Sequence, residues 1–169
     1  MDGFLNHRID PQLCFEMAQE LKRLYEGAGV NKILTIEASG IALGCMTGYV
    51  FRSPLVFAKK SKTKNISDNL WSVEVESFTH GNRNTVIVSK EYLGPGDRVL
   101  IVDDFLATGA ALIGLKALVE QAGGTVVGAG IAIEKAFQGG GDKLRAQGLR
   151  VESLAKIARM TDDGIEFCD

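Results

Sequence analysis

Two adjacent aspartates occupy a position where a sugar phosphate could be held. Asp103 and Asp104 directly follow residues 99–102, four branched aliphatics that predict a strand buried on both faces, as in a parallel sheet. Gly109 closes the next segment, and residues 110–121 are typical of a helix. Open α/β sheets bind ligands at the carboxyl ends of their strands, and the amides and dipole at a helix start favour an anion. The carboxylates can accept hydrogen bonds from vicinal hydroxyls while the amides hold a phosphate.

A second loop with similar chemistry follows a strand predicted over residues 32–36. Ser39 and Gly40 lie between that strand and a helix predicted over residues 41–51. Free backbone amides at a helix start suit a second phosphate group. The alternative is that Gly40 only permits a tight turn.

Two further segments have both a functional and a plain interpretation. The lysine run 59–64 follows a strand predicted over residues 55–58, and such runs usually form a solvated face. Lys135 and Phe137 follow another apolar strand, whose end could simply be solvated, with Phe137 returning to the core. In the functional interpretation Phe137 stacks a purine base and Lys135 contacts an exocyclic oxygen. A lysine only donates hydrogen bonds, which favours a 6-oxopurine over adenine.

The elements that position these residues follow an alternating β–α order. Asp10 and Pro11 suit the start of a helix, and apolar residues at helical spacing continue to Leu24. Alternation of strands with helices predicts βαβ units and a parallel sheet. The remaining predictions are a hairpin arm from runs 71–79 and 84–90, a turn at 93–97, a strand over 125–133, a loop at 139–141, and a closing pair of strands at 151–157 and 165–168.

Bulk properties exclude several classes of protein. The chain has 169 residues, enough for one domain with a proper core, and its formal charge is −2, which gives no sign of nucleic-acid binding. No stretch approaches the roughly 20 apolar residues of a membrane span, and no signal peptide is evident. Cys14, Cys45 and Cys168 form no close pair, and with only His7 and His80 a zinc site is not expected. We therefore expect a cytoplasmic protein whose reduced thiols act as small apolar fillers.

The run 99–109 closely resembles the phosphoribosyl-pyrophosphate (PRPP) motif of the type I phosphoribosyltransferases. Colinear segments across the whole chain resemble the xanthine phosphoribosyltransferases of that family; they are residues 4–7, 36–42, 68–70, 134–138 and 150–155. The resemblance implies an α/β fold in one domain over residues 1–169. It comprises a mostly parallel central sheet flanked by helices, a β arm with a flexible loop, and a small hood from about residues 1–10 and 134–169.

The resemblance also implies roles for individual residues. Asp103 and Asp104 would face the ribose hydroxyls, and Lys59 and Lys60 would assist departure of pyrophosphate, whose negative charge grows in the transition state. The 5-phosphate site would be formed by Ala107, Thr108, Gly109, Ala110 and Ala111, and the pyrophosphate site by Ser39 and Gly40. Asn6 and Lys135 match residues that bind the base in the family, and Phe137 joins this base site through its aromatic side chain and its position alone.

Two departures from the xanthine family pattern concern the base. Family members usually carry a further segment before the one that matches residues 4–7, including an apolar residue that touches the base. Their cradle commonly reads Ala-Asn-Gly-Gln, whereas residues 107–110 read Ala-Thr-Gly-Ala, a version shared with adenine and orotate enzymes. Hypoxanthine–guanine enzymes typically have an aspartate where this chain has Ala107, which argues against that branch.

Together these features predict a Mg-dependent enzyme of purine salvage that converts xanthine and PRPP to XMP and pyrophosphate. The metal is expected to be held through PRPP, and Asp103 is the one candidate protein ligand. The resemblance implies a homodimer, with small-molecule substrates and neither nucleic acid nor membrane as partner. The alternatives are an adenine or other purine phosphoribosyltransferase, or a purine- or PRPP-sensing regulator of the same fold. The order of preference among xanthine, guanine and hypoxanthine is left open.

Overall fold

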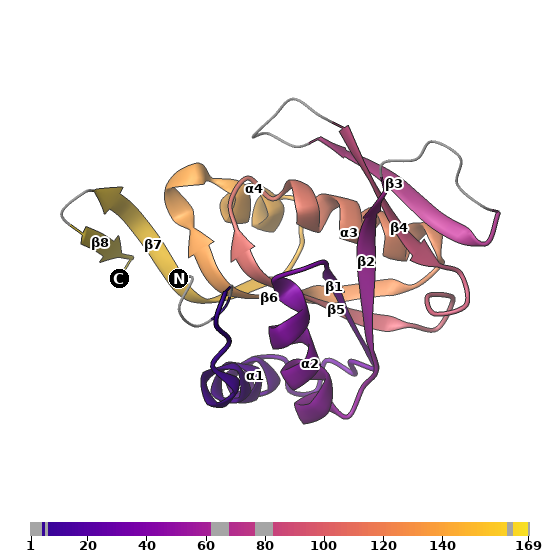
Figure 1. Cartoon of the computed structure of the whole chain (residues 1–169), viewed down its shortest axis with the longest axis horizontal. Helices are drawn as coiled ribbons and strands as arrows, with labels where there is room; N and C mark the ends of the chain where they lie inside the picture. Colours follow the sequence, from indigo (N-terminus) through magenta and orange to yellow (C-terminus); the bar gives the residue numbers. More distant parts are fainter. Residues whose placement is uncertain (1–4, 6, 62–67, 77–82, 162–163, 169) are drawn as a thin grey trace.

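The computed structural model describes residues 5, 7–61, 68–76, 83–161 and 164–168, which form one eight-stranded sheet with helices on both faces (Figure 1). In chain order the elements are α1 (Pro11–Leu24), β1 (Lys32–Ile36), α2 (Gly40–Phe51), β2 (Leu55–Ser61), β3 (Leu70–Glu76), β4 (Arg83–Ser89), β5 (Arg98–Leu106), α3 (Ala110–Gln121), β6 (Thr125–Lys135), the 3-10 helix η1 (Ala136–Gln138), α4 (Gly140–Ala146), β7 (Val151–Thr161) and β8 (Gly164–Phe167).

The order of the strands creates a natural ligand site between β1 and β5. The sheet runs β3-β4-β2-β1-β5-β6-β7-β8. Its five central strands are parallel to one another; they are β2, β1, β5, β6 and β7. From β1 the chain crosses through α2 to β2 on one side, whereas from β5 it crosses through α3 to β6 on the other. Open sheets bind ligands at such a reversal of direction, outside the carboxyl ends of the strands. The predicted parallel sheet is thus confirmed.

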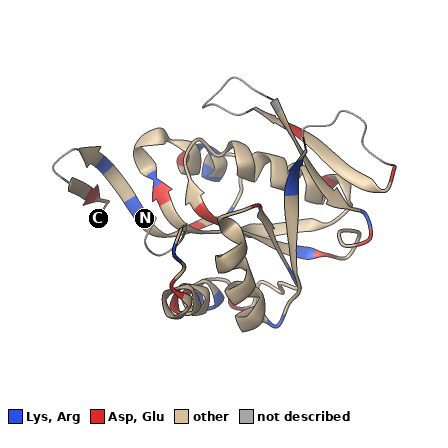
Figure 2. Cartoon of the chain, in the orientation of Figure 1, with Lys and Arg blue, Asp and Glu red and all other residues tan. Residues whose placement is uncertain are grey.

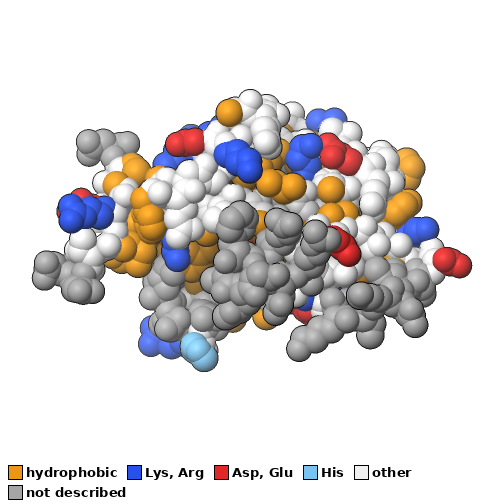
Figure 3. Space-filling view, turned by 90° about the horizontal axis from the view of Figure 1, so that it is seen from above, with side chains coloured by type: hydrophobic (Ala, Val, Ile, Leu, Met, Phe, Trp, Pro, Cys, Tyr) orange, Lys and Arg blue, Asp and Glu red, His pale blue; other side chains and the backbone are white. Residues whose placement is uncertain are grey.

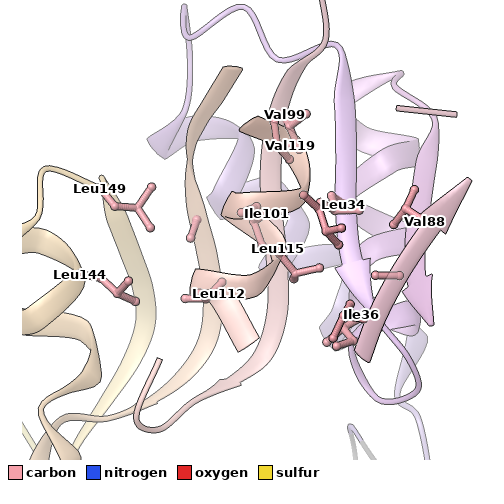
Figure 4. Close-up of a cluster of buried hydrophobic side chains, with 14 of the residues drawn as sticks. Leu34, Ile36, Val88, Val99, Ile101, Leu112, Leu115, Val119, Leu144 and Leu149 are labelled. Atoms are coloured by element: carbon pink, nitrogen blue, oxygen red, sulfur yellow. The ribbon is translucent and has the colours of Figure 1, made fainter. Parts of the chain in front are cut away.

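Each face of the sheet has its own layer of helices and its own core. α1 and α2 cover one face, and α3 and α4 cover the other (Figure 1). Under α3, leucines at positions 112, 115 and 118 meet the aliphatic side chains of β1, β5 and β6 (Figure 4). Under α1 and α2, Leu21 and Leu43 pack on the opposite side of β5, against Leu100 and Val102. Because β5 is buried on both faces, the site at its end has a rigid base.

The first helix begins as the sequence predicts. The side chain of Asp10 accepts a hydrogen bond from the backbone N–H of Leu13 at 3.1 Å, and Pro11 is the first helical residue. Leu5 lies just before this helix and is only 1% exposed, packed in the core beneath α1. Leu5 is therefore anchored in the core on this face of the sheet.

Three expectations are wrong in detail. The glycines at 139–141 do not form a simple loop, because Gly140 and Gly141 are the first two residues of α4. Cys14 is buried as expected, but Cys45 and Cys168 are exposed and do not fill the core. Strands β2 and β5 also extend beyond the predicted ends, to Ser61 and Leu106.

The β7–β8 hairpin closes the sheet at the end opposite the β3–β4 arm, and both antiparallel pairings are as predicted. Its last part is exposed on both faces, and hydrophobic side chains gather at this end of the molecule (Figure 3). Met160 and Ile165 are direct cross-strand partners and are 48% and 49% exposed. In the part of the chain that the structure describes, no helix has the length and apolar character that crossing a membrane requires.

Candidate functional site

The sheet splits open where the two aspartates lie. Backbone pairing between β1 and β5 reaches only Leu34 and Ile101, while β5 continues alongside β6, so that Asp103 pairs with Ile131. The sequence predicts that the aspartates follow the strand, but in the structure they lie within β5. Both are 6% exposed. The second loop adjoins them, since a Cβ on Gly40 would stand 2.8 Å from Asp103 Oδ1.

The two carboxylates are a strained electrostatic pair. Burial, and then the negative charge of Asp104, raise the pKa of Asp103 well above its ordinary value. The positive charge of Lys60 acts in the opposite direction. The backbone N–H of Asp104 donates to Asp103 Oδ1 at 3.0 Å, which fixes that carboxylate. Figure 2 shows the acidic residues near the carboxyl ends of β5 and β6 and basic residues near the end of β2. A ligand that supplies hydroxyl donors or a cation would relieve this pair.

The segment 107–111 forms a backbone cradle after β5. Gly109 has φ 87° and is the N-cap of α3, a left-handed conformation that favours glycine. No side chain caps the helix, so the amides of its first turn are left for another acceptor. Ala107, Thr108, Ala110 and Ala111 are all partly exposed around this start. The geometry suits an anion such as a phosphate.

The loop between β1 and α2 forms the other side of the split. Ser39 is the N-cap of α2 and its side chain makes no capping hydrogen bond. Glu37 Oε1 accepts the backbone N–H of Lys60 at 2.8 Å, which joins this loop to β2. Of the buried side-chain nitrogen and oxygen atoms in the described residues, Thr35 Oγ1 alone has no hydrogen-bond partner. It lies directly below Gly40, where a Cβ would overlap it, so only glycine fits there.

The two candidate lysines point to different places. Lys59 and Lys60 belong to β2 itself, where they pair with Ile87 and Val86 of β4, and do not lie in a loop after the strand. The charge of Lys60 acts on Asp103, whereas Lys59 Nζ lies 5.7 Å from the ring centroid of Phe57. The structure therefore brings Lys60 toward the aspartates and places Lys59 away from them.

The candidate base residues lie beyond the end of β6. Lys135 Nζ is 5.4 Å from the ring centroid of Phe105, the residue after the aspartates. Phe137 is in η1 and is 50% exposed, so it does not return to the core. Phe105 was not predicted; the alternation of side chains in a longer β5 could have found it. Asn6, like Lys62, Lys64 and His80, lies outside the described residues.

Sequence reasoning also missed a buried ion pair beside Lys135. Glu134 is 1% exposed, and Arg145 donates to both of its carboxylate oxygens, at 2.9 and 2.6 Å. Burial raises the pKa of Glu134, but the hydrogen bonds from Arg145 and Ser153 outweigh it, so that the pKa lies below its ordinary value. Nothing in the spacing of residues 134 and 145 signals this contact.

A protein-family model described as a phosphoribosyl transferase domain matches residues 5–147. This chain belongs to the phosphoribosyltransferase family. It is 50% identical over 165 residues to the xanthine phosphoribosyltransferase of Lachnoclostridium phytofermentans, covering 97% of this chain and 85% of that protein. It is also 50% identical over 169 residues to that of Finegoldia magna, covering 100% and 89%. The family resemblance drawn from the sequence is confirmed.

Solved phosphoribosyltransferase structures share the fold. Adenine phosphoribosyltransferases from Thermoanaerobacter pseudethanolicus and Rhodothermus marinus both superpose with a TM-score of 0.76. Their sequence identities are 29% and 27%, over 87% of this chain and 82% and 81% of theirs. The predicted type I phosphoribosyltransferase fold is thereby confirmed for this phosphoribosyltransferase.

Proposed function

We propose that this protein transfers the 5-phosphoribosyl group of PRPP to N9 of xanthine, giving XMP and pyrophosphate, as a cytoplasmic enzyme of purine salvage. The observation that carries the proposal is the split between β1 and β5, which holds two carboxylates between two uncapped helix starts. Such an arrangement offers carboxylate acceptors for hydroxyl groups between two phosphate sites. This matches PRPP, in which the ribose hydroxyls lie between the 5-phosphate and the pyrophosphate. The relatives named as xanthine phosphoribosyltransferases, at about 50% identity, support the choice of base.

Catalysis in this proposal depends on positioning and charge. The bond from the ribose C1 to the pyrophosphate oxygen breaks, the bond from C1 to purine N9 forms, and the N9 proton is released. Asp103 and Asp104 accept hydrogen bonds from the ribose hydroxyls, and the 107–111 cradle holds the 5-phosphate. Ser39 and Gly40 hold pyrophosphate, and Lys60 stabilises the charge that grows on it. No nucleophilic side chain is required, since the site holds the ribose C1 and the purine N9 in position to react directly.

Base selection falls to the end of β6. A lysine offers only donors, so Lys135 would favour a purine with a keto oxygen over one with an amino group. Phe105, below the Lys135 ammonium, supplies an aromatic face near the reacting centre, and Phe137 supplies a second, exposed one. Asn6 remains part of the proposed base site by resemblance. Adenine, the alternative base, would leave the lysine facing an amino group.

Magnesium fits the donors at the split. Mg²⁺ prefers oxygen ligands and usually takes one or two carboxylates together with substrate phosphates. In the described residues no group of three or more His, Cys, Asp or Glu side chains could hold a metal alone. PRPP would hold the ion, with Asp103 as the candidate protein ligand, and when bound the ion would neutralise charge on the departing pyrophosphate.

We also propose a homodimer that uses the outer face of β2 and β4. A groove of about 660 Å³ there is lined by apolar side chains, among which Phe57 and Tyr92 are 41% and 55% exposed. Lys59 lines the same groove, away from the aspartates of its own chain. A second copy on this face would bury these aromatic groups, and Lys59 would then lie at the dimer interface. Sedimentation analysis tests this proposal: we expect the wild type to be a dimer and Phe57→Glu to be a monomer. A monomeric wild type would contradict the proposal.

The reaction itself is tested by product analysis. Incubation with PRPP, Mg²⁺ and xanthine should yield XMP and pyrophosphate in equal amounts, measured by chromatography and a coupled pyrophosphate assay. A folded protein that binds PRPP and xanthine without forming either product would instead support the sensing regulator. Absence of both binding and turnover would contradict the proposal altogether.

A further inference from the structure

The Glu134–Arg145 pair is built as a clamp rather than as a reactive group. Both carboxylate oxygens of Glu134 are engaged by the guanidinium, and the Ser153 hydroxyl donates to Oε2 as well. A bidentate pair of this kind fixes orientation as well as distance. Because its oxygens are occupied and it is 1% exposed, Glu134 is not free to exchange protons with a ligand. Its effect on the site is therefore through position.

The clamp holds α4 against two strands. Besides its contacts with Glu134 on β6, Arg145 donates from Nε to the backbone carbonyl of Val151 on β7 at 3.1 Å. Glu134 is the residue directly before Lys135, the proposed contact to the base. The end of β6 therefore cannot shift without moving Arg145, and with it α4.

The other end of α4 lies against the phosphate cradle. A Cβ on Gly140 would overlap the carbonyl oxygen of Ala107 and stand 2.8 Å from the backbone nitrogen of Gly109. A Cβ on Gly109 would stand 3.1 Å from Leu144 Cδ1. At Gly140 the helix and the cradle therefore meet backbone to backbone, while the Leu144 side chain of the same helix packs against Gly109. Gly141 completes the path, since a Cβ there would overlap the Glu134 carboxylate.

We infer that Arg145 is a positioning residue that couples occupancy of the 107–111 cradle to the placement of Lys135, so that a bound sugar phosphate strengthens purine binding. The inference rests on the proposed function, because it requires a phosphoribosyl ligand and a base in one site. The physical link is one short helix, held at its start by the cradle and at its end by Glu134. Coupling between two binding sites is reciprocal, so the base strengthens sugar-phosphate binding by the same factor.

Calorimetric titration measures this coupling without turnover. Xanthine is titrated into the whole protein with and without saturating ribose 5-phosphate, a probe that fills the cradle but carries no leaving group. For the wild type we expect ribose 5-phosphate to lower the Kd of xanthine by about tenfold, within the range of ordinary couplings. The coupling ratio is the Kd of xanthine without ribose 5-phosphate divided by its Kd with ribose 5-phosphate. Arg145→Lys keeps the charge but loses the bidentate contact, and this ratio should fall to about one while each ligand still binds.

Two matched variants separate coupling from simple damage. Lys143→Ala changes an exposed residue on the same helix and should keep the wild-type ratio. Ser153→Ala removes one hydrogen bond to Glu134 and should give an intermediate ratio even if Arg145→Lys fails to fold. The inference is overturned if folded Arg145→Lys or Ser153→Ala keeps the wild-type coupling ratio. It is also overturned if both ligands bind more weakly while the ratio is unchanged. Neither result would contradict the proposed function. A wild type that binds neither ligand overturns the proposed function, and this inference with it.

Discussion

The two sides of the candidate site are assembled in different ways. The phosphoribosyl side, residues 103–111, is one unbroken stretch of chain whose parts are backbone amides and two adjacent carboxylates. The base side, residues 134–138, is held in place by Arg145 of α4 and Ser153 of β7. A site of the first kind is visible in a linear sequence, while one of the second kind depends on contacts that only the fold creates. The difference also predicts how each side responds to substitution.

The largest effect is expected on the phosphoribosyl side, which every base must share. Asp103→Asn combined with Asp104→Asn should lower turnover at least about 100-fold, because the acceptors for the ribose hydroxyls lose their charge. The loss should be equal for all purines that the wild type uses. Steady-state pyrophosphate release, with circular dichroism to verify folding, measures it. Full activity in a folded double variant would falsify the ribose role.

Substitution on the base side should act on the purine alone. Lys135→Ala removes a charged donor worth about 1.5–3 kcal/mol, which corresponds to about a 10–100-fold higher KM for the base. The KM for PRPP should stay within about twofold. Initial rates with one substrate varied at a time provide both constants. An equal loss for both substrates would erase the division between the two sides.

The same division explains which parts of the fold could be predicted. Strand β1 and helices α1 and α3 follow from local apolar spacing, caps and glycines, and they are confirmed. The ends of β2 and β5 could not be predicted, because Lys60 and Asp103 are polar and their strand conformation depends on pairing with Val86 and Ile131. Lys59 was grouped with Lys60 by sequence, yet strand alternation separates them.

Helix α4 was missed for a related reason. Three successive glycines normally predict a loop, since glycine is a poor helix former. Here positions 140 and 141 are helical and are glycine because a Cβ there would overlap the cradle backbone or Glu134. Contact, not propensity, selects these residues. The Glu134–Arg145 clamp has no local signal either, so the base side was only partly predicted.

The contact between the two sides gives the next largest effect. Gly140→Ala places a methyl group against Ala107 and should displace the cradle, at a cost of about 1–3 kcal/mol. We expect the KM for PRPP to rise about tenfold. Gly94→Ala is the matched control, because nothing lies within 4 Å of a Cβ there and its φ is not in the left-handed region. A Gly140→Ala enzyme with unchanged constants would show that the cradle does not depend on α4.

The smallest effect concerns stability on the phosphoribosyl side. The raised pKa of Asp103 means that its stabilising contribution is fully present below the unfolded pKa, near 3.8, and is lost as pH rises through the folded value. Asp103→Asn should therefore raise Tm at pH 7 by about 2–4 °C, the shift that about 1 kcal/mol gives in a domain of this size. The gain should shrink as pH falls toward 4. Thermal unfolding over that range tests it, and a gain independent of pH would contradict it.

The most direct test of the account is the specificity constant of the wild type for four bases. Pyrophosphate release with PRPP and Mg²⁺ is measured with xanthine, guanine, hypoxanthine and adenine in parallel. The account predicts the highest kcat/KM for xanthine, the base of the proposed reaction, and the lowest for adenine, since Lys135 at the end of β6 offers only donors and would face the amino group of adenine. An enzyme that prefers adenine would contradict it, and would show that the base side does not select in the way that its geometry indicates.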